Sequence, residues 1–246
     1  MRLGSVSRPR SSTGPGRLAR VAAGTSLRGP ATSSGDAVLG SSFMAQLSRA
    51  DQVAALARMI AALDTRPAPS FDAFAALFHG KSLRKGEVFV RAGEASDSVA
   101  LVNSGIARMF YTRGDGKEFN KAFVSAPDFM SVLEALITGE PARLTIQALT
   151  PMQLFVAPYA RLSEFCERDI YWERVSRRIV ERVYVKKVRR EASLLMDTAA
   201  DRYRAFVAEH GAVASRVPDY HIAAYLGITP EALSRLKRAA KRSVSS

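Results

Sequence analysis

Cysteine and histidine are scarce in this 246-residue sequence. It holds one cysteine, Cys166, and three histidines, at positions 79, 210 and 221, which show no metal-ligand spacing. A single cysteine cannot form a disulfide within the chain, and it cannot by itself hold zinc or an iron–sulfur cluster. We therefore expect no metal site and no iron–sulfur cluster. Composition leaves haem open, but no histidine has a convincing position in the expected barrel, so we predict no cofactor. The scarcity of cysteine favours a reducing, cytoplasmic location.

Long hydrophobic runs are also missing. The chain is 47% hydrophobic, but no stretch reaches the ~18 apolar residues that a membrane helix needs. A chain of this length can bury one large core or two small ones. The sequence thus predicts a folded protein without a membrane partner.

Acidic residues are few at both ends of the chain. Of the net charge of +13, residues 1–43 contribute +5, residues 44–171 are balanced, and residues 172–246 contribute +8. A basic C-terminal third beside a neutral middle is typical of a protein with a polyanionic partner, most often nucleic acid. The plainer alternative is a solvated basic face.

The first 43 residues are rich in Ser, Gly, Pro, Arg and Ala and have no sustained apolar period. This composition predicts a disordered tail. It also fits an organellar transit peptide, or a protein whose translation really begins at Met44. We favour the tail or the later start, because the C-terminal features described below are bacterial in type.

Residues 44–161 change their hydrophobic period once. The stretch from Met44 to Phe78 has a helical pattern, interrupted by RPAPS. From residue 83 onward, short β-like runs alternate with glycines, TRGDGKEF carries an Asp-Gly hairpin signal, and a helical patch falls at 132–138. About eight short strands at this spacing predict a small antiparallel barrel or jelly roll, and hence an α+β fold.

The helical period returns over residues 162–196. One side of the expected helix is a narrow apolar seam between basic flanks, formed by Trp172, Val175, Ile179 and Val183. This pattern predicts a dimerisation helix with these four residues at the interface. An ordinary helix packed on its own barrel is the alternative.

The segment IAAYLGITPEALSRLKRAAK, residues 222–241, fits two short helices around a tight turn. A helix-turn-helix needs apolar residues on the facing sides and a glycine where the backbone turns. Ile222, Leu226 and Leu233 meet the first requirement, and Gly227 meets the second. The sequence therefore predicts a helix-turn-helix, with Thr229 as the N-cap of its second helix.

The outward face of that second helix carries residue types that read DNA. Glutamate can accept from a cytosine amino group, arginine can bond guanine bidentately, and further basic residues suit phosphates. The predicted DNA contacts are Thr229, Glu231, Ser234, Arg235, Lys237 and Arg238. The alternative is a helical hairpin with a charged outer face.

Over roughly residues 71–242, the sequence resembles the Crp/Fnr family of bacterial transcription regulators. LRKGEVFVRAGEASDSVALVNSGIARMFY is similar to the start of the family's cyclic-nucleotide-binding-like barrel, and RYRAFVAEHGAVASRVPDYHIAAYLGITPEALSRLKR to its C-terminal part. In the second match, the family's Glu-x-x-Ser-Arg falls on Glu231, Ser234 and Arg235.

The resemblance implies a homodimeric, non-enzymatic regulator. Its expected parts are a sensor barrel of the double-stranded β-helix or jelly-roll type, a long dimerisation helix and a winged helix-turn-helix. Few residues follow the recognition helix, so we expect a truncated wing. The implied partners are double-stranded DNA with an inverted repeat of TTGA-like half-sites, a second copy of the chain, and RNA polymerase.

These expectations divide the chain into four parts. We assign residues 1–43 to a tail, 44–161 to a sensor domain, 162–196 to a dimerisation helix and 197–246 to a helix-turn-helix domain.

The family's phosphate-binding cassette is altered in this chain. Ser131-Val132 stands where the family has Gly-Glu, Glu134 is displaced, and one residue separates Arg143 from Thr145. A ribose hydroxyl normally needs its carboxylate partner, and a bound phosphate needs its guanidinium. We therefore do not expect the usual mode of cyclic AMP binding, and we name Glu134, Arg143 and Thr145 as candidate contacts of an unidentified effector.

Two other classes of function stay open. A cupin-like metal enzyme would need a His/Glu cluster on the strands, and the predicted strands hold no histidine. A regulatory module acting through protein contacts would use the terminal helices to bind another protein instead of DNA.

Overall fold

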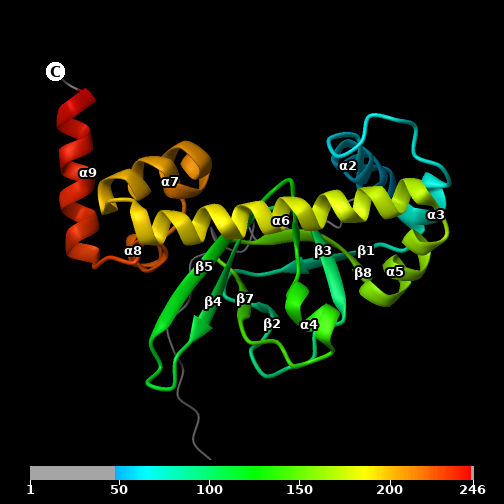
Figure 1. Ribbon diagram of the computed structural model, residues 1–246, viewed down its shortest axis with the longest axis horizontal. Coiled ribbons are helices and arrows are strands. Elements are labelled where there is room, and N and C mark those ends of the chain that lie inside the picture. The colour runs from blue at the N-terminus through cyan, green and yellow to red at the C-terminus, as the bar shows by residue number, and fades with distance from the viewer. Residues whose placement is uncertain (1–47, 245–246) are drawn as a thin grey trace, which may run out of the picture.

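The structure, a computed structural model, describes residues 48–244 (Figure 1). The predictions for residues 1–43 lie outside this part of the chain. Within it, two antiparallel sheets of four strands, ordered β1-β8-β3-β6 and β2-β7-β4-β5, face each other. The strands are β1 (His79–Leu83), β2 (Val88–Val90), β3 (Ser98–Ser104), β4 (Ile106–Thr112), β5 (Glu118–Ser125), β6 (Asp128–Met130), β7 (Thr145–Ala148) and β8 (Met152–Pro158).

The helices lie outside this barrel. They are α2 (Arg49–Ala61), α3 (Phe71–Ala76), α4 (Leu133–Thr138), α5 (Tyr159–Glu167), α6 (Ile170–Met196), α7 (Ala199–Ala214), α8 (Asp219–Leu226) and α9 (Pro230–Val244). Helix α6 runs along the long axis of the molecule, with α2 and α3 at its N-terminal end and α7, α8 and α9 at its C-terminal end (Figure 1).

The predicted α+β fold and jelly-roll barrel are confirmed, with the hairpin and the helical patch in the expected places. Two details differ from the prediction. Strand β1 begins at His79, so the barrel does contain one histidine, although its side chain is exposed. No strand follows β8 within residues 48–244, so the described chain has no wing hairpin. The division into domains remains a prediction.

Alternation along the strands produces two separate cores. On β3, Ala100 and Val102 face the barrel interior, while Leu101 between them faces outward. Leu101 pairs across the sheet with Phe155 of β8, and both belong to an outer core that the helices cover. This two-sided burial explains why the first sheet holds helices against its outer face.

The first turns of α6 are part of that outer core. Trp172 is 1% exposed and Val175 is 2% exposed. The Trp172 ring stacks on Phe74 of α3 at a centroid distance of 4.0 Å, and its Nε1–H donates to the carbonyl of Pro69 at 2.8 Å. The prediction that Trp172 and Val175 form a dimer interface is therefore wrong, because the chain's own barrel and helices bury them.

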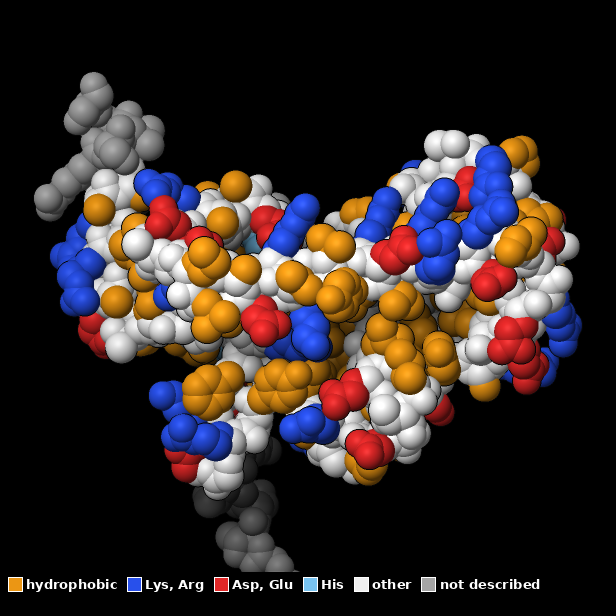
Figure 2. Space-filling model, viewed as in Figure 1, with side chains coloured by type: hydrophobic (Ala, Val, Ile, Leu, Met, Phe, Trp, Pro, Cys, Tyr) orange, Lys and Arg blue, Asp and Glu red, His pale blue; other side chains and the backbone are white. Residues whose placement is uncertain are grey.

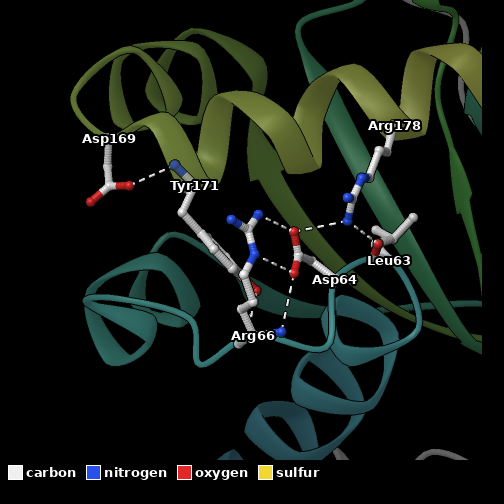
Figure 3. Close-up of polar contacts among 6 residues, drawn as sticks. All are labelled: Leu63, Asp64, Arg66, Asp169, Tyr171 and Arg178. Atoms are coloured by element: carbon white, nitrogen blue, oxygen red, sulfur yellow. Dashed lines mark hydrogen bonds and ion pairs between the residues drawn. The ribbon is translucent and has the colours of Figure 1, made fainter.

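A buried carboxylate fixes the loop between α2 and α3 to α6 (Figure 3). Arg66 donates to Asp64 through two side-chain nitrogens and its backbone amide, and Arg178 of α6 donates to Asp64 at 2.8 Å. The hydrogen bonds from Arg66, followed by the charges of Arg66 and Arg178, hold the pKa of Asp64 well below its usual range. The carboxylate therefore stays charged and paired.

The turn between β3 and β4 requires a glycine. Gly105 has φ +92°, and a Cβ placed on it would lie 2.4 Å from the carbonyl oxygen of Pro151. Both the positive φ and the close contact exclude a larger residue without backbone movement.

We predict that Gly105→Ala lowers the free energy of unfolding by about 2–4 kcal/mol, from strain plus overpacking. Gly114→Ala is the matched control, because a Cβ added at Gly114 would meet no atom within 4 Å and its φ is not positive. Urea denaturation of both variants measures the effect. Equal stability of the two variants would contradict the role given to Gly105.

Candidate nucleic-acid interface

Helices α8 and α9 form the predicted helix-turn-helix geometry. Helix α8 ends at Leu226 and is capped by Gly227, whose φ of 70° reverses the backbone. The amide of Gly227 donates to the carbonyl of Ala223. The amide of Ile228 donates to the same carbonyl at 3.1 Å. A left-handed residue at this position is the usual way to end a helix tightly, and glycine adopts it without strain.

The facing sides of the two helices are apolar and buried. Ile222 and Leu226 of α8 and Leu233 of α9 are each fully buried, and Phe206 of α7 completes their cluster. These contacts fix α9 against the rest of the unit, so its opposite side is left for solvent or a partner.

The N-terminus of α9 is capped as expected. The Thr229 hydroxyl accepts from the amide of Ala232 at 3.2 Å. Hydrogen bonds from the backbone amide of Glu231 and from the Thr229 hydroxyl lower the pKa of Glu231. Glu231 is therefore an anionic acceptor at neutral pH, at the end of the helix that enters a DNA groove first in helix-turn-helix proteins.

Most of the predicted DNA contacts lie on one outer face of α9. Pro230, Glu231, Ser234, Arg235 and Arg238 line a single shallow depression. Basic side chains gather along the outer edge of this helix, at the far left of the molecule (Figure 2). The arrangement combines one acidic acceptor, one hydroxyl and two guanidinium donors, which are the groups that recognise base edges and phosphates.

Lys237 differs from this group. Its ammonium pairs with the carboxylate of Asp219 at the start of α8, and its side chain is 30% exposed. Lys237 therefore connects the two helices, and the structure does not place it on the outer face with Arg235.

Two arginines attach the unit to α6 and α7. The guanidinium of Arg190 lies 4.0 Å from the ring centroid of Tyr225 and donates to the Tyr225 carbonyl. Arg202 donates through Nε to the carbonyl of Leu226 at 3.0 Å. Both carbonyls belong to the last turn of α8, where backbone acceptors have no partner within the helix.

The unit also packs directly on the barrel. Phe123 of β5 lies 5.3 Å from the ring of Tyr225 and 5.9 Å from that of Phe206, measured between centroids. Ile106 and Leu149 of the barrel belong to the same cluster. The second sheet thus shares an apolar core with the helix-turn-helix.

A buried arginine lies at the centre of this contact. Arg108 of β4 is 6% exposed and donates to the Gln147 side chain at 2.7 and 2.9 Å. It also pairs with Glu118 and donates to Nδ1 of His221 on α8 at 3.2 Å. Asn120 donates to the carbonyl of His221 at 2.8 Å. The sequence pattern did not predict this cluster, although Arg108 in the apolar run IARMFYT was the available signal.

These partners determine the state of His221. A guanidinium can only donate, so Nδ1 is the acceptor and the ring proton lies on Nε2. Burial, followed by the positive charge of Arg108, lowers the pKa of His221 to about 4, with Glu118 acting in the opposite direction. His221 is therefore neutral at neutral pH, and protonation would place two cations in contact.

The three candidate effector contacts are only partly brought together. Arg143 and Glu134 form an ion pair at 3.5 Å, with side chains 73% and 49% exposed. Thr145 is buried, and its hydroxyl accepts from the amide of Ala92 at 3.1 Å. Arg143 is thus engaged at the surface, and Thr145 is used by the backbone of a neighbouring turn.

Among residues 48–244, no three His, Cys, Asp or Glu side chains lie together in a metal-binding arrangement. Burial raises the pKa of Cys166 to about 11, so it is a thiol and not a reactive thiolate. In the same part of the chain, no helix has the length and apolar character required to cross a membrane.

Comparisons with known proteins agree with this architecture. The sequence profile of the Cyclic nucleotide-binding domain matches residues 80–169, which extend from β1 to the end of α5. No curated protein matches the sequence.

Several solved structures are similar to the chain. FixK2 from Bradyrhizobium japonicum has a TM-score of 0.61 and 21% identity, over 68% of this chain and 85% of FixK2. The c-di-GMP-responsive global regulator CLP from Xanthomonas campestris has a TM-score of 0.56 and 16% identity, over 70% of this chain and 90% of CLP. A transcriptional regulator of the Crp/Fnr family from Eubacterium rectale has a TM-score of 0.57 and 14% identity, over 73% of this chain and 86% of that protein.

The chain thus has the fold of Crp/Fnr-type regulators, and the resemblance inferred from the sequence is confirmed at that level.

We predict that His221 makes stability depend on pH. Its pKa is about 4 in the folded chain and about 6.5 when unfolded. Between these values the unfolded state binds more protons, so the free energy of unfolding falls as the pH is lowered from about 6.5 to about 4. Going from pH 7 to 4.5, His221 should account for a loss on the order of 2–3 kcal/mol.

Urea denaturation at both pH values measures this loss. His221→Gln should remove it, whereas the same change at the exposed His79 should leave it in place. If wild type and His221→Gln lose equal stability on acidification, the neutral histidine is not the cause.

Proposed function

We propose that this chain is a homodimeric, DNA-binding transcription regulator of Crp/Fnr type and not an enzyme. The observation that carries the proposal is the outer face of α9, where Glu231, Ser234, Arg235 and Arg238 lie together and uncovered. The similar regulators in the structural comparison support it. So does the net charge of +8 in residues 172–246.

In this proposal the groups of α9 divide into two kinds. Glu231 and Arg235 read base edges, because an anionic acceptor and a guanidinium donor distinguish cytosine and guanine in the major groove. Ser234 and Arg238 contact a base edge or a phosphate. Lys237 stabilises the pair of helices through Asp219.

The dimer requires a different face of α6 from the one that the sequence favoured. Val180, Tyr184, Val188 and Leu195 are 42%, 65%, 44% and 80% exposed. Their spacing places them on one side of a 27-residue helix. A row of exposed apolar side chains on a long helix is what a second copy of the same helix would bury.

The four residues first predicted for the interface therefore have different roles. Trp172 and Val175 are in the core, Ile179 is half-buried against it, and Val183 is 46% exposed beside the proposed seam. A two-fold axis along this seam would present two α9 helices to successive major grooves, so the DNA site is an inverted repeat with half-sites about 10 base pairs apart. TTGA-like half-sites and an RNA polymerase contact follow from the family resemblance.

The barrel would act as the sensor of an unidentified effector, without the usual mode of cyclic AMP binding. The shared core of Phe123, Phe206 and Tyr225 and the Arg108–His221 contact give the barrel a direct connection to α8. A change in the β4–β5 hairpin would thereby alter the position of the helix-turn-helix.

We predict that Arg235→Ala costs roughly 1–3 kcal/mol of specific DNA binding and relaxes the preference for one guanine. The preferred sequence is first selected from random DNA with the wild-type protein. Fluorescence anisotropy then compares selected and mutated duplexes, with Arg161→Ala on α5 as the control. An equal loss on every sequence would make Arg235 a phosphate contact.

The same assay at two salt concentrations tests DNA binding itself. A dimer with several phosphate contacts should lose affinity steeply, on the order of 10³-fold between 50 and 200 mM salt. A regulatory module that acts through protein contacts would show little binding and no such slope.

For the dimer, we predict that Val188→Asp yields monomers, because a carboxylate from each copy would be buried in the seam. Val185→Asp is the matched control, since Val185 is 43% exposed but lies outside this row, on the side of α6 that faces α2. Analytical ultracentrifugation reports the state of both variants. Dissociation by the Val185 change, with Val188→Asp remaining dimeric, would exclude this seam.

A further inference from the structure

A groove with a volume of about 1000 Å³ lies between α2, α6 and strands β3 and β6. Residues of α2 line one wall of the groove, and residues of α6 line the other. At one end Arg178 closes it by donating to the carbonyl of Leu63 at 2.6 Å and to Asp64 (Figure 3). Arg182 adds a second bridge, to the carbonyl of Ala62 at 2.9 Å.

The lining of the groove is apolar at several points. Met59 and Leu63 contribute from the α2 side, Phe129 from β6, and Ile179 and Val183 from α6. These side chains offer a surface to an apolar body.

The rest of the lining is basic. It contains five cationic side chains, from Arg58, Arg178, Arg182, Lys186 and Arg189, and only two acidic ones, from Asp128 and Glu181. Lys186 pairs with Asp128 at 2.8 Å, and Glu181 pairs with Arg177 outside the groove.

Two of these cationic side chains are unpaired within the described chain. Across residues 48–244, the guanidinium groups of Arg58 and Arg189 have neither a hydrogen-bond partner nor an ion-pair partner. One comes from each wall. An excess of unpaired positive charge over an apolar lining is complementary to a negatively charged head group on an apolar body.

The groove is separate from the other surfaces of the proposed regulator. On α6, the cationic residues Arg182 and Arg189 lie about 100° or more around the helix from Val180, Tyr184 and Val188. Only Val183 belongs both to the lining and to the border of the proposed seam, so the proposed dimer leaves the cationic part of the groove open. No residue of α4 or β7, which carry the candidate effector contacts, lines it.

We propose that this groove binds an amphiphilic organic anion, whose apolar body lies on Met59, Phe129 and Ile179 and whose carboxylate or phosphate head meets Arg58 and Arg189. The volume is at the upper end of small-molecule sites, about 300–1000 Å³, which favours one such molecule over a folded partner. A bound molecule would link α2 to α6 and so give the chain a ligand site outside the barrel.

Calorimetric titration of the full chain tests the proposal, with decanoate and decyl phosphate as anionic probes and 1-decanol as the neutral one. We expect one anion to bind per chain. The affinity for 1-decanol should be lower than that for the anions by about tenfold or more. If decanoate binds more tightly than decyl phosphate, the groove prefers a carboxylate head group, and the reverse order indicates a phosphate. Equal binding of decanol and decanoate, or no binding of either anion at millimolar concentration, would overturn the proposal.

Variants locate the site. The double variant Arg58→Gln/Arg189→Gln should lower the affinity for the anion by about tenfold or more. The control variant Arg84→Gln/Arg168→Gln removes the same amount of charge from exposed positions elsewhere, and it should leave the affinity nearly unchanged. Ala55→Trp should block the groove with its charges intact. If the first pair loses no more affinity than the control pair, the site lies elsewhere.

The last titration uses the Val188→Asp variant, which we predict to be monomeric. It should retain the anion, because α2, α6 and the strands of a single chain already form the groove. Loss of binding on dissociation would mean that two copies share the site, and it would overturn the proposal. The titration of the wild-type chain and the arginine and Ala55 variants depend neither on DNA nor on the dimer, so failure of this proposal and failure of the proposed function are distinguishable.

Discussion

The packing of the first turns of α6 on the barrel is the constraint on which the rest of the molecule depends. Trp172 stacks on Phe74 and is hydrogen-bonded to Pro69, so the rotation of α6 about its axis is fixed at its N-terminal end. A helix is stiff over its length, and a rotation fixed at one end is fixed along all 27 residues. The burial of Trp172 therefore decides which apolar residues face outward and which cationic residues form the groove with α2.

A second contact fixes the other end of α6. The helix-turn-helix unit is held by the arginine contacts to the last carbonyls of α8 and by the core that it shares with the second sheet. Within that core Arg108 is charged and buried, and its cost of desolvation is offset only while Glu118, Gln147 and a neutral His221 all accept from it. The orientation of the helix-turn-helix unit is thus specified by a polar network that tolerates few alternatives, whereas apolar packing alone would permit sliding.

The proposed functions use surfaces that these two contacts leave uncovered. The outer face of α9, the row from Val180 to Leu195 and the groove along α2 are formed by different sets of residues. DNA, a second copy and a small anion could thus be bound together. Each ligand would still act on α6 or on elements attached to it, which provides a physical route for one binding event to influence another.

The sequence by itself determined the local features: strands with turns at glycine, the end of α8 at Gly227, the cap of α9 and the grouping of Glu231, Ser234 and Arg235 on one helical face. Each depends on backbone preferences or on periodicity over a few residues, and both can be read without knowing the partners. Only the tertiary structure decided which apolar row of α6 is covered. The row that contains Trp172 is buried in the outer core, whereas the row that contains Val180 is exposed. It alone paired Lys237 with Asp219 and brought Arg108 to His221, 113 positions away. Such long-range contacts depend on how the elements fold back on one another, and the spacing of residues along the chain does not encode that in a readable form.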